Sequence, residues 1–283
     1  MTVAGSAGGE LVLVATPIGN LGDLSPRAVD ALRTAALICC EDTRRTGQLL
    51  SHAGIRGVPM AVTNEHTERS RVDEVIDVLN GGRNVALVSD AGTPGISDPG
   101  ERLVRAVVAA GHRVSAVPGP AALVMAVVIS GFDTSRFVFE GFLPRSGGER
   151  TQRLAEVASE HRTVVLYEAP HRVARTIADL RTVCGPERRV ALARELTKMH
   201  EETWRGTLSE AVAHLSVHEP RGEFVVVLEG APAPPPADDA AIRAALLTAM
   251  GDGESRSTAV TTVMAALGVP KRRVYDIATA LPR

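Results

Sequence analysis

Aromatic residues, cysteines and long apolar runs are all scarce in this chain of 283 residues. Aromatic side chains make up 3% of the sequence, so few rings remain for the stacking platform of a single-strand nucleic-acid binder. Cys39 and Cys40 are adjacent and Cys184 stands alone, a pattern that predicts neither a disulfide framework nor a zinc site. This cysteine usage is typical of a reducing compartment, and we expect a cytoplasmic protein.

An excess of charge of one sign and membrane-directed segments are also absent from the sequence. The formal net charge is -2, which argues against a protein that holds nucleic acid mainly by neutralising phosphates. An RNA-binding role therefore requires local basic patches and a structured target. Such patches occur at Arg44 with Arg45, Arg172 with Arg175, Arg188 with Arg189, and Lys271 with Arg272 and Arg273. The first ten residues lack the apolar core of a signal peptide, and the apolar stretches are too short to cross a bilayer.

The first half of the chain alternates short β-type runs with helical patterns. Strand patterns occur at residues 11–15, 37–40, 58–62, 85–88 and 114–117. Helical patterns lie between them, at about 26–36, 43–54, 68–79 and 99–110. Ser25 and Pro26 predict the start of the first helix, and Asp42 or Thr43 that of the second. This β-α order predicts an α/β fold with a mostly parallel sheet that is covered on both faces.

The second half predicts another α/β domain and a helical appendage. Strand patterns occur at residues 136–142, 163–167, 190–194, 201–205 and 224–228, and the last three are predicted to be partly antiparallel. A stiff proline-rich linker at 231–236 precedes a helical region that resembles a helix-turn-helix or a plain helical hairpin. The predicted domains are residues 11–118, 119–230 and 238–283.

Three loops rich in glycine and proline follow three of the predicted parallel strands. They span residues 16–23, 88–100 and 117–122. Ligands of open α/β sheets bind at the carboxyl ends of the strands, so these loops predict a shared ligand site. For residues 88–100 alone, a tight turn in which Asp98 caps the next helix is the alternative. The first loop is not a dinucleotide fingerprint and lacks the lysine of a P-loop.

Charged residues follow three other strands. Glu41 and Asp42 suit acid–base chemistry, although capping of the next helix also explains Asp42. His171 is a candidate base or a polar residue at a helix start. Residues 193–198 mix both charges, which also fits a solvated network of ion pairs.

The motifs in this order resemble the small-subunit ribosomal RNA methyltransferase I family of the tetrapyrrole methylase superfamily. The strings that carry the resemblance are residues 16–23, 41–44, 89–94, 118–120, 139–144, 167–168 and 193–198, and the likeness runs from about 11 to 230. The resemblance implies a two-domain class III methyltransferase that is a homodimer. It implies S-adenosylmethionine as cofactor, and 2′-O-methylation of a cytidine in 16S rRNA near the decoding centre.

The family's cofactor contacts carry over to positions that match its motifs. They are Pro17, Ser89, Asp90, Ala91, Thr93, Ala121, Ala122, Glu168, Leu196, Gly222, Glu223 and Phe224. The superfamily often has threonine where Ala121 stands, so this chain lacks that side-chain hydrogen bond. The first loop also lacks the glycine-rich string of porphyrin-methylating relatives, which favours RNA as the substrate.

Roles beyond cofactor binding are hypotheses about the strand ends. The candidate bases are Asp23, Glu41, Asp42 and Lys198, and Lys198 is also a candidate phosphate ligand. The candidate phosphate contacts are Arg44, Arg145 and Arg172. The modest net charge favours 16S rRNA within the folded 30S subunit as the substrate.

Three further functions compete with RNA methylation. A nucleotide hydrolase would need a metal site, and we expect no metal, since Asp90 and Asp98 are too few to form one. A tetrapyrrole-type small-molecule methylase would need a cleft that accommodates a large ring. A non-catalytic RNA-binding module would use the C-terminal helices, and its glycine-rich loops would be structural.

Overall fold

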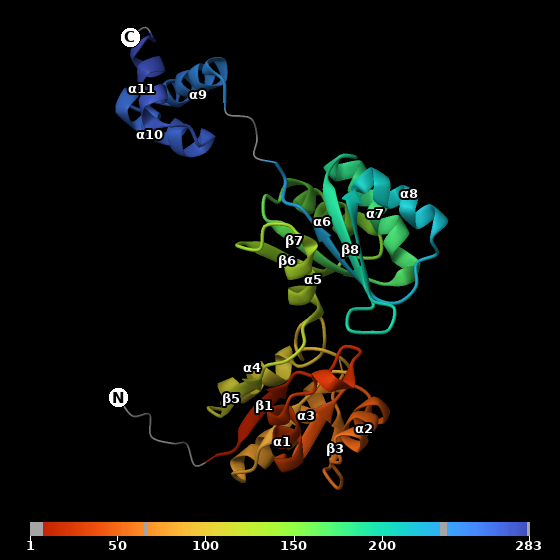
Figure 1. The fold of residues 1–283 in the computed structure, drawn as a ribbon. Helices are drawn as coiled ribbons and strands as arrows, with labels where there is room; N and C mark the ends of the chain where they lie inside the picture. Colours follow the sequence, from red (N-terminus) through yellow and green to blue (C-terminus); the bar gives the residue numbers. More distant parts are fainter. Residues whose placement is uncertain (1–7, 65–66, 233–236, 282–283) are drawn as a thin grey trace. The chain divides into compact units, whose positions relative to one another are not determined.

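The computed structural model describes residues 8–64, 67–232 and 237–281. It divides into two compact units, Met1–Ala231 and Pro232–Arg283 (Figure 1). Most of the N-terminal segment without a signal pattern (residues 1–7) and most of the predicted proline-rich linker (residues 233–236) lie outside the described residues.

The first sheet is built from five parallel strands in the order β3-β2-β4-β1-β5. The strands are β1 (Glu10–Val14), β2 (Leu37–Cys40), β3 (Met60–Val62), β4 (Val85–Leu87) and β5 (Arg113–Val117). The helices around them are α1 (Pro26–Thr34), α2 (Thr43–His52), α3 (Glu68–Asn80) and α4 (Glu101–Ala109). Apolar side chains of α1 and α2 pack on one face and those of α3 and α4 on the other. The prediction of a parallel sheet covered on both faces is confirmed.

Local capping explains where these helices begin. The Ser25 side chain accepts a hydrogen bond from the backbone N–H of Ala28, and the Asp42 side chain accepts one from Arg44, as the sequence predicted. The helix after β4 differs from the prediction, because α4 begins at Glu101 after Gly100, whose φ is +132°. Gly100 is the N-cap and makes no side-chain bond, so the alternative in which Asp98 caps this helix is wrong.

The second sheet of the same unit is mixed, in the order β6-β7-β10-β8-β9. Its strands are β6 (Phe137–Phe142), β7 (Thr163–Glu168), β8 (Arg189–Arg194), β9 (Glu202–Thr207) and β10 (Phe224–Leu228). β6 runs parallel to β7, whereas β10 pairs antiparallel with β7 and β8, and β8 with β9. The predicted antiparallel character of the last three strands is confirmed.

Helices cover both faces of this second sheet. α5 (Ala122–Ser130) packs on one face, and α6 (Gly147–Ser159), α7 (Pro170–Cys184) and α8 (Leu208–Val217) pack on the other. The sequence prediction omitted α8, although Thr207 and Glu210 form a capping box at its start. A Thr followed three residues later by Glu is a signal that marks such a helix start.

The C-terminal unit has a core of its own. It contains α9 (Asp239–Gly251), α10 (Arg256–Leu267) and α11 (Lys271–Thr279), which bury apolar side chains against one another. α10 ends at Gly268, whose φ of +62° is left-handed, and Pro270 precedes α11, as the sequence predicted. α9 adds a third helix to the predicted pair.

Candidate functional site

The three predicted ligand loops meet at one edge of the first sheet. Thr16 and Gly92 form an isolated antiparallel bridge, with N···O distances of 2.8 and 3.0 Å. The Thr93 hydroxyl donates to the carbonyl of Pro120 over 3.2 Å, which joins the third loop to the second. Gly92 has a φ of +83°, and a Cβ there would lie 3.3 Å from the Ile18 side chain. The prediction that the loops share one edge is confirmed.

A depression of about 320 Å³ opens at this edge. Pro17, Ser89 and Asp90 line it together, so the structure brings three predicted cofactor residues to one wall. The opposite wall comes from α2 and was not predicted. The other lining residues are Thr16, Leu21, Arg45, Thr46, Gln48 and Leu49.

The Asp90 carboxylate is held at the rim of the depression by its neighbours. Its Oδ1 accepts a hydrogen bond from the Asp42 backbone N–H over 3.2 Å. Its Oδ2 lies 3.4 Å from a guanidinium nitrogen of Arg45, and its own N–H donates to Glu41 Oε1 over 3.1 Å. One quarter of the Asp90 side chain is exposed, so the oriented carboxylate still has room to accept bonds from a ligand.

Asp98 joins Glu41 and Asp90 in a group of three carboxyls at this edge. Burial raises the pKa of Asp98 to about 7; the charge of Glu41 adds to this rise and a hydrogen bond with Ser89 opposes it. Burial also raises the pKa of Glu41, although the N–H of Asp90 lowers it. Asp98 therefore exchanges a proton near neutral pH, as a general base requires. Asp98 was not among the predicted bases; the sequence pattern indicated only a helix cap or one of two carboxylates, too few for a metal site.

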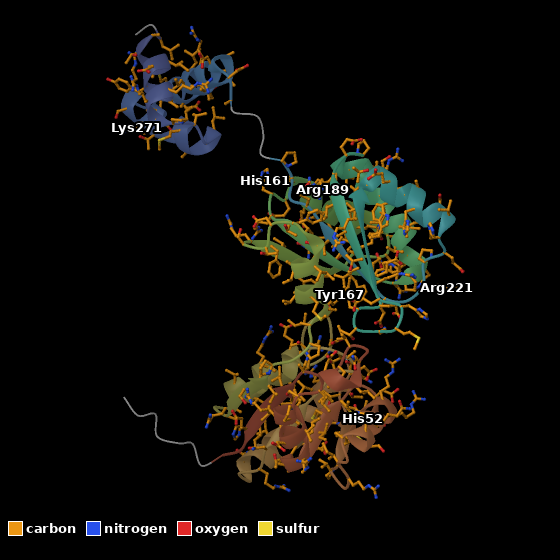
Figure 2. The ribbon with its side chains drawn as sticks, viewed as in Figure 1. His52, His161, Tyr167, Arg189, Arg221 and Lys271 are labelled. Carbon is orange, nitrogen blue, oxygen red and sulfur yellow. The ribbon has the colours of Figure 1, made fainter. Side chains whose placement is uncertain are left out.

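The second sheet also borders this group of carboxyls. Burial raises the pKa of Tyr167, which is labelled in Figure 2, and the charge of Asp98 adds to that rise. A Cβ on Gly141, at the bulge of β6, would lie 3.2 Å from the Ser97 hydroxyl. The loop at 88–100 therefore contacts both sheets of the first unit.

The other predicted bases are engaged in structural contacts or exposed. Asp42 caps α2 and pairs with Arg44, whose hydrogen bonds lower the pKa of Asp42 to about 2. Asp23 is exposed in a short 3-10 helix, Leu21–Asp23. Partial burial lowers the pKa of Lys198, but its bonds to two carboxylates outweigh that effect and leave it above its ordinary value. A lysine held in its charged form suits an anion contact better than a base.

The carboxylates that bind Lys198 are Glu195 and Glu223, at 2.9 and 3.0 Å from its Nζ. The predicted alternative of an ion-pair network at residues 193–198 is confirmed. Glu195 also accepts a bond from the Glu223 N–H over 3.1 Å and packs against Gly222, whose φ is +77°. The network thus fixes the loop in front of β10, where two predicted cofactor contacts lie.

The same loop contacts the first ligand loop. The Asn20 N–H donates to the Thr197 hydroxyl over 3.2 Å, and Ile18 packs with Leu196 against the apolar face of the second sheet. Glu195 and Thr197 have φ values of +50° and +66°. Left-handed backbone in residues other than glycine marks strain, which often occurs at functional sites.

The remaining predicted cofactor residues occupy different environments. Ala91 is exposed, while Ala121 and Ala122 begin α5 without a side-chain cap. Phe224 is buried in the core that faces α6, α7 and α8, so its ring points away from the face on which α5 lies. A cofactor contact at Phe224 therefore depends on its backbone.

Glu168 is buried, and both of its carboxylate oxygens are engaged. Oε2 accepts from the Thr176 hydroxyl at 2.6 Å, and Oε1 accepts from the Ala169 N–H at 3.0 Å and lies 3.2 Å from Arg172 Nε. Arg172 also donates to the carbonyl of Leu143. These contacts favour a structural role for Glu168 and Arg172, and they do not favour the predicted cofactor contact or phosphate contact.

This environment leads to a prediction for Glu168→Ala. The substitution should lower the free energy of unfolding by about 2–4 kcal/mol, because it removes the carboxylate that accepts from the buried Thr176 hydroxyl and pairs with Arg172, and leaves Arg172 with the Leu143 carbonyl. Urea denaturation measures this loss, and Glu101→Ala on the exposed face of α4 is the control with little change. An unchanged stability together with weaker cofactor binding would instead assign Glu168 to the cofactor.

The predicted phosphate contacts Arg44 and Arg145 are exposed, and Arg45, which was not predicted, is two-thirds exposed. His171 is exposed in the first turn of α7, where Ala169 is the N-cap. No group of three or more His, Cys, Asp or Glu side chains suited to a metal ion occurs in the described part of the chain. Nor does any helix of those residues combine the length and apolarity that a membrane crossing requires.

The sequence of this chain matches a known protein family. The family model for tetrapyrrole (corrin/porphyrin) methylases matches residues 10–212. The ribosomal RNA small subunit methyltransferase I of Synechocystis sp. is 47% identical over 275 residues, which cover 96% of this chain and 98% of that protein. The protein of the same name from Pseudomonas aeruginosa is 50% identical over 229 residues, or 80% of each chain.

Solved structures share the fold at lower identity. The methyltransferase CobJ has a TM-score of 0.60 and 22% identity, covering 79% of this chain and 95% of its own. The uroporphyrin-III C-methyl transferase of Thermus thermophilus, in complex with S-adenosyl homocysteine, has a TM-score of 0.55 and 18% identity, covering 78% and 97%. The predicted class III architecture is thereby confirmed.

Proposed function

This chain belongs to the tetrapyrrole methylase family and, within it, to the ribosomal RNA small subunit methyltransferase I proteins, and we propose on that premise that it methylates ribosomal RNA with S-adenosylmethionine. The finer proposal is 2′-O-methylation of a cytidine ribose in 16S rRNA near the decoding centre. The cofactor supplies an electrophilic methyl carbon on a charged sulfur. The task of the protein is to align that carbon with a ribose hydroxyl.

The observation that carries this proposal is the Asp90 carboxylate at the rim of the depression beside Pro17. A carboxylate that is oriented by Asp42 and Arg45 can accept bonds from the two hydroxyls of a ribose. Pro17 and Leu21 provide apolar surface next to it, which suits the adenine and thioether portions of the cofactor. The residues present therefore fit S-adenosylmethionine.

The other cofactor contacts remain part of the proposal. Ala91 and Thr93 lie in the same loop as Asp90, and Ala121 and Ala122 follow the loop that Thr93 binds. Leu196 packs with Ile18 of the first loop. These contacts support a cofactor site to which both sheets of the first unit contribute.

We assign the removal of the ribose proton to Asp98. A ribose hydroxyl is a weak nucleophile, and a base whose pKa lies near neutral pH assists it most effectively. Burial raises the pKa of Asp98 most, and the charge of Glu41 raises it further, so we assign Glu41 the role of tuning the base. Asp23 stays a candidate base without further support.

Arg44, Arg45 and Arg145 are the proposed contacts to RNA phosphates. Arg44 and Arg45 begin α2, beside the depression, and their guanidinium groups are mostly exposed. Since the net charge of the chain is -2, these contacts position a folded target and do not provide general affinity for RNA. This supports the assembled 30S subunit as the substrate.

The test uses the full chain, S-adenosylmethionine with a labelled methyl group, and 30S subunits from cells that lack the corresponding methyltransferase. We expect label in 16S rRNA, at one cytidine whose ribose becomes resistant to alkaline cleavage. Free 16S rRNA and uroporphyrinogen III are the parallel substrates. Label in the tetrapyrrole alone would refute the RNA proposal, and label on a base would refute the ribose as the acceptor.

We also propose that the chain acts as a homodimer, with the outer face of α5 in the interface. Val124 and Val128 lie one helical turn apart on α5 and are 48% and 65% exposed. Val128→Glu should shift the chain from dimer to monomer in analytical ultracentrifugation, because a charge cannot enter an apolar interface without cost. Val108→Glu on α4, where the valine is 58% exposed, is the matched control. A wild-type chain that sediments as a monomer at micromolar concentration contradicts the proposal.

A further inference from the structure

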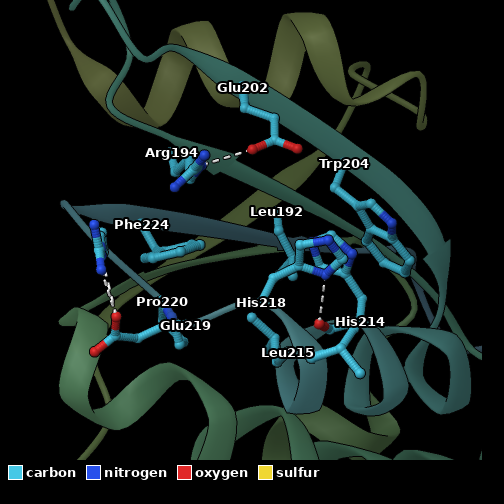
Figure 3. A pocket seen from close by; sticks show the side chains of 12 residues that line it. Leu192, Arg194, Glu202, Trp204, His214, Leu215, His218, Glu219, Pro220 and Phe224 are labelled. Atoms are coloured by element: carbon cyan, nitrogen blue, oxygen red, sulfur yellow. Dashed lines mark hydrogen bonds and ion pairs between the residues drawn. The ribbon is translucent and has the colours of Figure 1, made fainter.

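A second cavity, of about 370 Å³, lies on the face of the second sheet that α8 covers. It shares no residue with the depression at Asp90. Its apolar floor includes Leu192 of β8 and Phe224 of β10 (Figure 3). Volumes of this order are typical of sites for small molecules.

Three flat rings form a continuous stack along one wall of this cavity. The rings of Trp204 and His214 lie 5.0 Å apart with an interplanar angle of 21°, and those of His214 and His218 lie 4.4 Å apart at 23°. His218 is exposed, and its Nδ1 lies 3.0 Å from the His214 carbonyl. The outer end of the stack is therefore oriented and open to another ring.

A glycine beside Trp204 on β9 determines where the indole lies. A Cβ on Gly206 would lie 2.6 Å from the Trp204 ring and 2.7 Å from the Glu210 carboxylate. Only glycine leaves room for the indole at this place. Burial lowers the pKa of His214, and His218 adds to that effect, so the middle ring of the stack is neutral at neutral pH.

Two ion pairs border the cavity, and each consists of one arginine and one glutamate. Arg194 Nε donates to Glu202 Oε2 over 2.7 Å, and both side chains remain partly exposed (Figure 3). Arg221, labelled in Figure 2, pairs with Glu219 over 2.7 Å. Because each arginine is matched by a glutamate, the cavity does not select an anion. It offers donors and acceptors side by side, as the edge of a nucleobase requires.

We propose that this cavity binds an unpaired purine base, stacked on His218 and bonded by Arg194 and Glu202. Aromatic and imidazole rings are the groups on which proteins stack splayed-out bases. The source of the base rests on the proposed function: the RNA substrate would supply it from an unpaired stretch. The chemistry of the site stands without that function, since a free purine nucleotide presents the same ring.

Trp204 is the only tryptophan of the chain, so its fluorescence reports on this cavity directly. The full-length protein is titrated with a short unpaired oligoadenylate and, separately, with AMP, with excitation at the red edge of tryptophan absorption. We expect a saturable change in emission with the oligonucleotide, and at least tenfold weaker binding of AMP. Equal affinity for AMP would overturn RNA as the source, and no saturable change with either would overturn the site.

Two substitutions connect the signal to the cavity. His218→Ala should weaken oligonucleotide binding about tenfold, which is the usual size of a lost stacking contact. Arg194→Ala should weaken it to a similar degree through the loss of a charged hydrogen-bond donor. His52→Ala and Arg105→Ala, at exposed positions on α2 and α4, are the controls. Calorimetry with S-adenosylmethionine should give the same affinity for all four variants. In the wild type, methylation without a fluorescence response to the oligonucleotide would contradict this site alone, and a fluorescence response without methylation would contradict the proposed function alone.

Discussion

Replacement of Asp90 by asparagine is expected to weaken the binding of S-adenosylmethionine by at least about tenfold while the protein stays folded. Asparagine keeps an oxygen that can accept from the Asp42 N–H, so the loop retains its local bond. It removes the charge that strengthens bonds from ribose hydroxyls. Hydrogen bonds to a charged group contribute about 1.5–3 kcal/mol each, and about 1.4 kcal/mol corresponds to a factor of ten in affinity.

Isothermal titration calorimetry with S-adenosylmethionine and with S-adenosylhomocysteine measures the effect of Asp90→Asn. Both ligands should lose affinity to a similar degree, because both contain the ribose and only one contains the charged sulfur. Asp73→Asn, at an exposed position on α3, is the control for the loss of one carboxylate. A loss confined to S-adenosylmethionine would show that Asp90 attracts the sulfonium charge, and equal affinity of variant and wild type would remove Asp90 from the cofactor site.

The α/β fold followed from the sequence because its local signals agree with its packing. The strands β1, β2 and β4 contribute buried apolar side chains to the cores on both faces of the sheet, as a covered parallel sheet requires. Ser25 and Asp42 cap the helices that they were expected to cap. α8 was not predicted; it follows β9 without a loop, and the capping box of Thr207 and Glu210 is the local signal that marks its start.

The candidate site could be predicted only in part, since its electrostatics come from residues that are distant in the chain. Glycine, proline and an acidic residue at a strand end predict the ligand loops and Asp90. Nothing local to Asp98 indicates that Glu41 and Tyr167 lie near it. In the same way, the sequence shows an acidic residue at position 168, but it does not show that Thr176 and Arg172 bind the carboxylate oxygens of Glu168.

The largest effect on catalysis is expected from Asp98→Asn. The amide cannot take the ribose proton, so the rate of methyl transfer should fall by about 10²–10⁴-fold. Affinity for S-adenosylmethionine should change little, because Asp90 and not Asp98 is the proposed ribose contact. Single-turnover methylation of 30S subunits at saturating cofactor measures the rate. In the wild type this rate should rise with pH through about 7, where Asp98 loses its proton, and the rise should be absent from the variant.

The same substitution should have the opposite effect on stability. The pKa of Asp98 is higher in the folded protein than in the unfolded chain, so the protonated form favours folding. That contribution is fully present below the ordinary pKa of aspartate and is lost as the pH rises through about 7. Asparagine is neutral at every pH, so Asp98→Asn should unfold at a higher temperature than the wild type at about pH 8, and this difference should shrink as the pH falls and vanish at about pH 4, near the ordinary pKa of aspartate.

These two results together separate a base from a residue that merely supports the fold. A structural aspartate lost from this loop would lower the melting temperature and the rate together, at every pH. Replacement of a base that is kept at an electrostatic cost gives a slower enzyme that is more stable, and the gain in stability grows from about pH 4 and is complete above about pH 7. Glu41→Gln is the companion variant. Because the charge of Glu41 raises the pKa of Asp98, the rate of this variant should rise with pH at a lower pH than that of the wild type, and most of the rate should remain. If the Glu41→Gln profile stays in place while Asp98→Asn keeps full activity, the proton passes through another group, and Asp23 is the remaining candidate at this edge.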